Sequence, residues 1–320
     1  MKVAFVGKGG SGKSTMTALF LQYLKKSEKN ILAIDADINM NLAGLLGVEA
    51  DHSILLSDPN NANGIRDFLK GNNTRLQTAA NFLPTTPPAS GSNVIKDFDA
   101  DILQRYSQTI SKTPTFKLMT VGTYDKEGIG QSCYHSDLFV AENILSHTFP
   151  KKEDWVVCDM VAGTDAFAYS LHLQFDTIIL IAEPTPESVE VCKLYIDLAK
   201  EAGIEDLIQI VANKVEDEDD LAFIREKTGL SPIAHIPAMR ALKKLRQSGS
   251  AIDELEISSE ITTAMERIET AVLKTPMSEQ ARLELLHKLH KKLAVKEWVK
   301  MGYGDVLDQI DPSYKIEEAA

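Results

Sequence analysis

Apolar runs of strand length alternate with longer amphipathic segments along much of the chain. Several runs are apolar at consecutive positions, as in Ile178-Ile179-Leu180-Ile181, which is typical of parallel strands covered by helices on both faces. The alternation predicts βα units and hence an α/β fold with a doubly wound, mostly parallel sheet. The predicted strands are Lys2 to Val6, Ile31 to Ile34, Phe116 to Val121, Trp155 to Cys158, Thr177 to Ala182 and Leu207 to Ala212.

Two regions depart from this alternation. Residues 51–115 contain turn-forming clusters such as Pro84-Thr85-Thr86-Pro87-Pro88, and we expect there an insertion with at most two helices over the sheet edge. After Ile236-Pro237 the strands stop, and helical patterns cover residues 238–248, 258–274 and 278–301. We therefore predict a main domain, residues 1–274, and a helical C-terminal extension, residues 275–320.

The last predicted helix is amphipathic. We expect its apolar stripe to pack on the rest of the protein or on a second subunit, as most such stripes do. The alternative is that the helix lies on a membrane surface. The stripe consists of Leu283, Leu286, Leu289, Leu293 and Trp298, and Arg282 lies outside it with several lysines.

Composition and charge narrow the class of protein. With 44% hydrophobic and 25% charged residues the chain is expected to form a soluble globular protein. Its net charge of -12 disfavours nucleic acid as a partner, because phosphates are bound by clustered cations. The sequence contains no signal peptide pattern, no apolar run long enough to span a bilayer and three cysteines without disulfide spacing. We therefore predict a cytoplasmic protein without membrane contact.

The strongest motif is a glycine-rich loop that follows the first predicted strand. Residues Gly7 to Ser14 fit the pattern G-x-x-x-x-G-K-[ST], and a predicted helix comes next. Such a loop turns backbone N–H groups toward phosphates; Lys13 then reaches the β- and γ-phosphates and Ser14 binds Mg²⁺. The predicted ligand is a nucleoside triphosphate with Mg²⁺. Its predicted contacts are Gly7, Lys8, Gly9, Gly10, Ser11, Gly12, Lys13, Ser14 and Thr15, with Thr15 at the α-phosphate.

A second lysine makes this loop more specific. Lys8, directly after the first glycine, gives a segment that resembles the deviant Walker A motif of the family that includes MinD, ParA, the nitrogenase iron protein and the CooC-type nickel-insertion ATPases. The resemblance implies a homodimer in which Lys8 reaches the nucleotide of the partner subunit. There it would stabilise charge on the transferring phosphoryl group, as an arginine finger does. The alternative is a solvated surface lysine.

Three further positions match the same family. The segment Asp35 to Asn41 is similar to its D-x-D-P-x-x-N switch I, with Ile38 in place of the proline, and implies that Asp37 orients the attacking water. The resemblance also implies that Asp159, which begins Asp159-Met160-Val161-Ala162-Gly163, holds a water bound to Mg²⁺. Asn213 is implied to recognise adenine, so that the nucleotide is ATP, although it could also form an Asx-turn at the end of a strand.

A cysteine and a histidine mark a candidate transition-metal site. Cys133 and His135 stand where CooC-type proteins carry a C-x-C metal motif between the halves of a dimer. Thiolate and imidazole both bind zinc or nickel, so that two subunits could form one tetrahedral site. The alternative is a packed cysteine and a histidine near a helix N-terminus.

These features lead to three hypotheses of function. The first is an Mg-ATP-dependent, dimerising ATPase that acts in the maturation of a client metalloenzyme, similar to the CooC-type ATPases. The second is a regulatory switch ATPase of the MinD or ParA type that controls association with a partner or a surface. The third, an iron-sulfur reductase, ranks last because residues 164–170 contain no cysteine.

Overall fold

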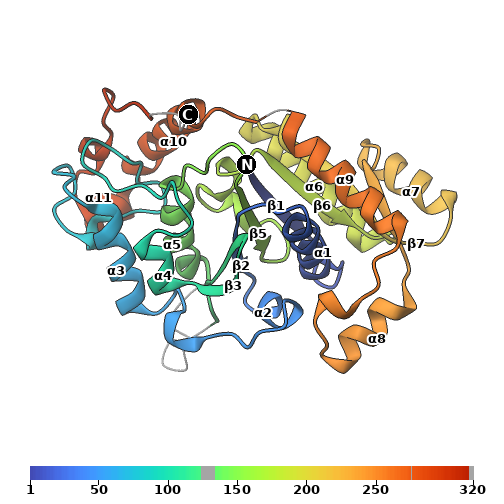
Figure 1. Ribbon diagram of the computed structural model, residues 1–320. Coiled ribbons are helices and arrows are strands. Elements are labelled where there is room, and N and C mark those ends of the chain that lie inside the picture. Colours follow the sequence, from blue (N-terminus) through green and yellow to red (C-terminus); the bar gives the residue numbers. More distant parts are fainter. Residues whose placement is uncertain (124–133, 275, 317–320) are drawn as a thin grey trace.

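The computed structural model describes residues 1–123, 134–274 and 276–316. Within this part of the chain, eight strands form one sheet in the order β3-β4-β2-β5-β1-β6-β7-β8 (Figure 1). All neighbouring strands are parallel except β3 and β4. The strands are β1 Lys2–Gly7, β2 Ile31–Ala36, β3 Gln108–Lys112, β4 Thr115–Thr120, β5 Trp155–Met160, β6 Thr177–Ala182, β7 Ile208–Val215 and β8 Ala234–Pro237. The predicted doubly wound α/β fold is confirmed.

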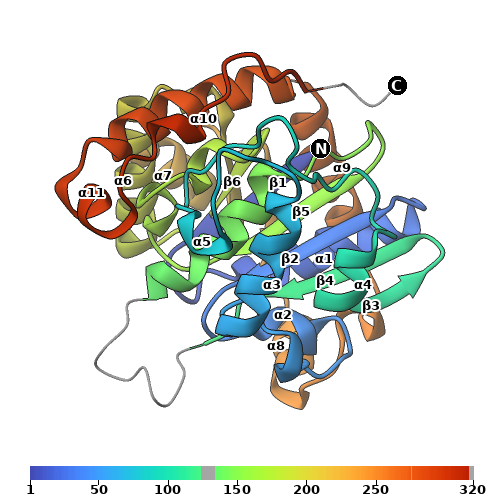
Figure 2. The same cartoon turned by 90° about the vertical axis from the view of Figure 1, so that its left-hand side faces the viewer.

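Helices cover both faces of this sheet (Figures 1 and 2). In β1, Val3 and Phe5 face a core that α1, α2 and α9 complete. Ala4 and Val6 face the opposite core, to which α3 to α7 contribute. The helices are α1 Lys13–Lys26, α2 Asn41–Leu45, α3 Pro59–Lys70, α4 Asp101–Tyr106, α5 Tyr134–Ser146, α6 Pro186–Ala202, α7 Glu218–Thr228, α8 Arg240–Ser248, α9 Ser259–Lys274, α10 Glu279–Ala294 and α11 Glu297–Tyr303.

The segment predicted as an insertion, residues 51–115, also supplies a strand that the sequence pattern did not reveal. Strand β3 pairs antiparallel with β4 and forms an edge of the sheet. None of its residues is fully buried, and Ile110 packs only partly against the core. An edge strand of this kind needs no continuous apolar run, so its sequence carried no strand signal.

The expectation of one long C-terminal helix was wrong. The chain forms α10 and α11, separated by Val295 and by Lys296, whose backbone is extended. Because the break changes the helical phase, Val299 is buried while Trp298, predicted in the apolar stripe, is 44% exposed. Arg282, predicted outside the stripe, is buried.

The C-terminal helices α10 and α11 and the residues that follow them pack on the segment formed by residues 51–115. His290 Nδ1 lies 2.9 Å from Thr85 Oγ1, and the Thr86 hydroxyl donates to Gln309 Oε1 at 2.7 Å. An apolar cluster joins the same two segments and contains Leu83, Ala294, Val299 and Val306. The two segments that interrupt the βα alternation therefore stabilise each other, away from the carboxyl ends of the strands.

Candidate nucleotide-binding site

The loop between β1 and α1 depends on two glycines. Gly7 and Gly12 have φ angles of 148° and 93°, a region that other residues rarely adopt. A Cβ atom on Gly7 would lie 2.6 Å from the Ile181 carbonyl oxygen, and one on Gly12 would lie 2.4 Å from Asn213 Nδ2. No described side chain caps the first turn of α1. Its N–H groups therefore remain available to an anion.

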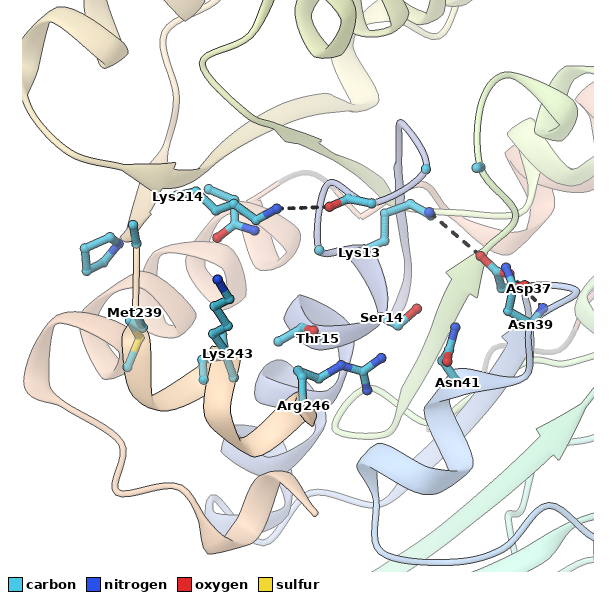
Figure 3. A pocket seen from close by; sticks show the side chains of 18 of the residues that line it. Lys13, Ser14, Thr15, Asp37, Asn39, Asn41, Lys214, Met239, Lys243 and Arg246 are labelled. Carbon is cyan, nitrogen blue, oxygen red and sulfur yellow. Dashed lines mark hydrogen bonds and ion pairs between the residues drawn. The ribbon is translucent and has the colours of Figure 1, made fainter. Parts of the chain in front are cut away.

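A cavity of about 770 Å³ opens beside this loop, at the carboxyl ends of the strands (Figure 3). The loop, the switch I segment and the ends of β7 and β8 all contribute to it. Of the residues singled out from the sequence, it is lined by Gly9, Gly10, Gly12, Lys13, Ser14, Thr15, Asp37, Asn41 and Asn213.

Asp37 is held in a defined orientation. Its Oδ1 accepts hydrogen bonds from the backbone N–H and the side-chain Nδ2 of Asn39, at 2.9 and 2.7 Å. Its Oδ2 lies 3.8 Å from Lys13 Nζ. Met40 closes the turn with a φ angle of 48°, a strained value for this residue type. Asn39 thus fixes Oδ1 of Asp37, and Oδ2 faces the ammonium group of Lys13.

Two more carboxylates lie behind the loop on adjacent strands. Asp35 of β2 and Asp159 of β5 are paired in the strand register and are both fully buried. Burial raises the pKa of Asp159 to about 7, against the lowering effects of a hydrogen bond from Ser14 and of Lys13. Burial and the neighbouring Asp159 also raise the pKa of Asp35. The raised pKa values show that the described residues do not fully compensate two negative charges at this position.

The free oxygen of this pair suits a hard cation. Asp159 Oδ1 accepts a hydrogen bond from Thr17 at 3.2 Å, whereas the buried Oδ2 has no hydrogen-bond partner among the described residues. Hydroxyl and carboxylate oxygens are ligands that Mg²⁺ accepts, usually with several waters. Ser14 and Asp159 thus fit an Mg²⁺ site.

Asn213 has a structural task in addition to the one predicted for it. Its Nδ2 donates to the Ser11 carbonyl at 2.7 Å, which fastens the end of β7 to the glycine-rich loop. The next residue, Lys214, donates from Nζ to the Gly10 carbonyl at 3.1 Å and pairs with Glu183. These contacts fasten the loop to β7.

Several predicted site residues do not line the cavity or cannot be placed. Gly7, Lys8 and Ser11 are not among the residues that line it, and Lys8 is only partly buried. Cys133 lies outside the described residues, and His135 is in the first turn of α5 with its side chain outside the description. Elsewhere in the described ranges, no group of three or more His, Cys, Asp or Glu side chains has metal-site geometry. Cys158 and Cys192 are buried free thiols.

The structure also adds residues that sequence reasoning missed. Asn39 and Lys214 line the cavity, as do Pro237 to Arg240 at the end of β8. Helix α8 continues the same wall. Its sequence, Arg-Ala-Leu-Lys-Lys-Leu-Arg-Gln-Ser, contains four cations and no acid in a chain of net charge -12. That local excess of cations was the signal that could have found it.

Known proteins resemble this chain in sequence and in fold. The family described as the CobQ/CobB/MinD/ParA nucleotide binding domain matches residues 3–252. The carbon monoxide dehydrogenase accessory protein CooC of Rhodospirillum rubrum is 27% identical over 256 residues, which make up 80% of this chain and 90% of that protein.

Solved structures share the fold at lower identity. A ParA family ATPase from Chlorobium tepidum TLS has a TM-score of 0.59 at 20% identity, covering 85% of this chain and 97% of that one. The septum site-determining protein MinD from Pyrococcus horikoshii OT3, complexed with Mg-ADP, has a TM-score of 0.51 at 18% identity, covering 92% and 97%. In the described part of this chain, no helix has the length and apolar character needed to cross a membrane.

Proposed function

Because this chain belongs to the CobQ/CobB/MinD/ParA family of nucleotide-binding domains, we propose that it is an Mg-ATP-dependent, dimerising ATPase that acts in the maturation of a metalloenzyme. The observation that carries the ATPase part is the cavity in which Lys13, Ser14 and Asp37 meet. Asp159 stands behind it, with one carboxylate oxygen that has no hydrogen-bond partner among the described residues. These groups combine phosphate binding, Mg²⁺ binding and water orientation in one place.

In the proposed reaction, water attacks the γ-phosphorus of ATP, and ADP and inorganic phosphate leave. Lys13 would bind the β- and γ-phosphates and draw away from Asp37, which lies 3.8 Å from it in this structure. The freed Oδ2 of Asp37 would then accept a hydrogen bond from the attacking water, while Asn39 holds Oδ1. Ser14 and Asp159 would hold Mg²⁺, which would supply positive charge beside the phosphates.

Dimerisation is proposed from Lys8. Its absence from the cavity wall of its own chain is compatible with a reach toward the nucleotide of a partner subunit. Asp37→Ala should bind ATP and stop hydrolysis, so that an ATP-bound dimer accumulates in light scattering after gel filtration. Adding Lys8→Ala should remove that dimer. An Asp37→Ala protein that stays monomeric with saturating ATP would exclude the dimer.

Metalloenzyme maturation is proposed from the similarity to CooC and from Cys133 and His135. Each subunit would supply one thiolate and one imidazole to a shared tetrahedral site for Zn²⁺ or Ni²⁺, with the metal as cargo. Equilibrium dialysis with each metal should give one metal per dimer, increased by ATP and lost in Cys133→Ser. Cys192→Ser, which alters a buried thiol, is the matched control. Binding that survives Cys133→Ser would exclude this site.

A surface feature favours a second candidate, a switch ATPase whose output is association with a partner or surface. Around α11, Val295, Trp298 and Met301 are 58, 44 and 83% exposed, and Lys292, Lys296 and Lys300 are exposed among them. Exposed apolar groups beside cations are common at interaction sites. ATP-dependent sedimentation with anionic vesicles, lost in Trp298→Ser, would favour this candidate over maturation.

A further inference from the structure

Helix α8 presents a row of cations to the nucleotide cavity. Arg240, Lys243 and Arg246 line the cavity, opposite the glycine-rich loop. They occur at every third position, so they share one side of the helix. Lys244 lies outside this row and does not line the cavity. The cations of α8 are therefore concentrated on the side of the helix that lines the cavity.

Nothing in the described part of the chain neutralises this row. Arg240, Lys243 and Arg246 are exposed, and none forms an ion pair with a described carboxylate. Like charges three residues apart on a helix repel each other. An anion in the cavity would relieve that repulsion, whereas water alone would only screen it.

Lys243 and Arg246 extend into different parts of the cavity. In Figure 3, Arg246 lies beside Thr15 and extends into the space between Thr15, Ser14 and Asn41, whereas Lys243 extends toward Lys214. Lys13, which is assigned to the β- and γ-phosphates, approaches from the loop on the other side of the cavity. Thr15 is the loop residue assigned to the α-phosphate, so Arg246 stands on the α-phosphate side.

We propose that Arg246 is a nucleotide-binding residue that contacts the α-phosphate from the same subunit, with Lys243 strengthening the positive field around it. This inference rests on the proposed function, since it assumes a nucleotide in the cavity. The phosphates then contact both walls of the cavity. The loop and Lys13 hold the β- and γ-phosphates, and Thr15 of the loop and Arg246 of α8 meet at the α-phosphate, so that a diphosphate product keeps its α8 contact.

The test compares Arg246→Ala with Lys244→Ala, which removes the same charge from the same helix outside the cavity. Inhibition constants of ATP, ADP, AMP and adenosine are measured by competition with labelled ATP. For an exposed charge-assisted hydrogen bond, Arg246→Ala should weaken ATP, ADP and AMP by the same factor, roughly fivefold to tenfold, and leave adenosine unchanged. Lys244→Ala should change no ligand by more than about twofold.

The ligand series separates the outcomes. A loss confined to ATP would place Arg246 at the γ-phosphate and overturn the proposal. Equal losses in Arg246→Ala and Lys244→Ala would indicate only a long-range field and would also overturn it. Unchanged affinities in Arg246→Ala would also overturn the proposal, once a thermal melting curve shows that the variant is folded. The proposed ATPase function would not be affected by that result. A wild-type protein that binds no ATP would instead remove the proposed function itself.

Discussion

Charged side chains are buried at both ends of the sheet, but they are paired more completely at the amino end than at the carboxyl end. At the amino end, Lys2 Nζ contacts Glu279 Oε2 at 3.1 Å and the Leu145 carbonyl at 3.2 Å. Arg282 donates to Asp176 Oδ1 at 2.6 Å and to the Leu173 carbonyl at 2.8 Å. The other oxygen of Asp176 accepts the Lys2 backbone N–H at 2.7 Å. This network fastens α10 to the start of β1.

The carboxyl end leaves its charges incompletely paired. Lys13 and Asp37 are 3.8 Å apart, and Asp159 Oδ2 and Ser11 Oγ have no hydrogen-bond partner among the described residues. The exposed Arg246 on α8 also has no counterion among the described residues. For the buried groups, incomplete pairing costs stability, which a bound ligand would offset. The network at the amino end therefore stabilises the fold, whereas the incomplete pairing at the carboxyl end supports the proposed nucleotide site.

The strongest expected effect is at the amino end. Arg282→Ala leaves the Asp176 carboxylate buried without its cation, which should lower the free energy of unfolding by about 3–5 kcal/mol. Chemical denaturation measures the change, and Lys292→Ala on the exposed side of α10 is the control. A loss below about 1 kcal/mol would contradict a stabilising role of the network.

Lys13→Ala is the counterpart at the carboxyl end. It should weaken ATP binding by roughly 3 kcal/mol, a little over a hundredfold, because the main side-chain charge for the β- and γ-phosphates is lost. Unfolding should change little, since its pairing with Asp37 is loose. Calorimetric titration and denaturation give both numbers. Lys8→Ala is the control, because it removes a loop lysine that is proposed to contact only the nucleotide of the partner subunit. If Lys13→Ala kept its ATP affinity and lost much of its stability, Lys13 would serve the fold and not the binding of nucleotide.

Acid should loosen the amino end through His147. This fully buried side chain has its pKa lowered to about 4, mainly by burial and further by Lys2. Between about pH 6.5 and pH 4 the unfolded chain binds the proton and the folded one does not, so stability falls as the pH falls. The loss approaches roughly 3–3.5 kcal/mol at the acid limit, since one pKa unit corresponds to about 1.4 kcal/mol. His147→Gln should flatten this part of the stability curve, whereas exposed His52→Gln should not. Parallel curves for both variants would exclude His147.

Asn39→Ala should have the smallest effect, confined to turnover. It removes the side-chain hydrogen bond to Asp37 Oδ1 and keeps the backbone one, so hydrolysis should slow about tenfold with ATP affinity unchanged. In an Asp37→Ala background the same change should have no further effect on residual turnover. A matching loss of ATP affinity would make Asn39 a binding residue instead.

Local patterns explain which predictions succeeded. The glycine-rich loop and the apolar parallel strands are encoded by residues close together in sequence, and both the α/β class and the family resemblance followed from them. Strand β3 was missed because an edge strand carries no apolar run. The break between α10 and α11 was missed because no proline or glycine marks Val295 and Lys296.

The sequence by itself determined the loop with Lys13, the carboxylates at the strand ends and the fold class, because neighbouring residues fix backbone conformation and the direction in which strands end. Only the tertiary structure decided that α8 lines the cavity and that Arg282 pairs with Asp176, 106 residues away in the chain. A lone arginine in an amphipathic helix has the same local pattern whether it meets water, a carboxylate or a ligand. Its partner is chosen by packing between distant segments, where burial makes an unpaired charge costly.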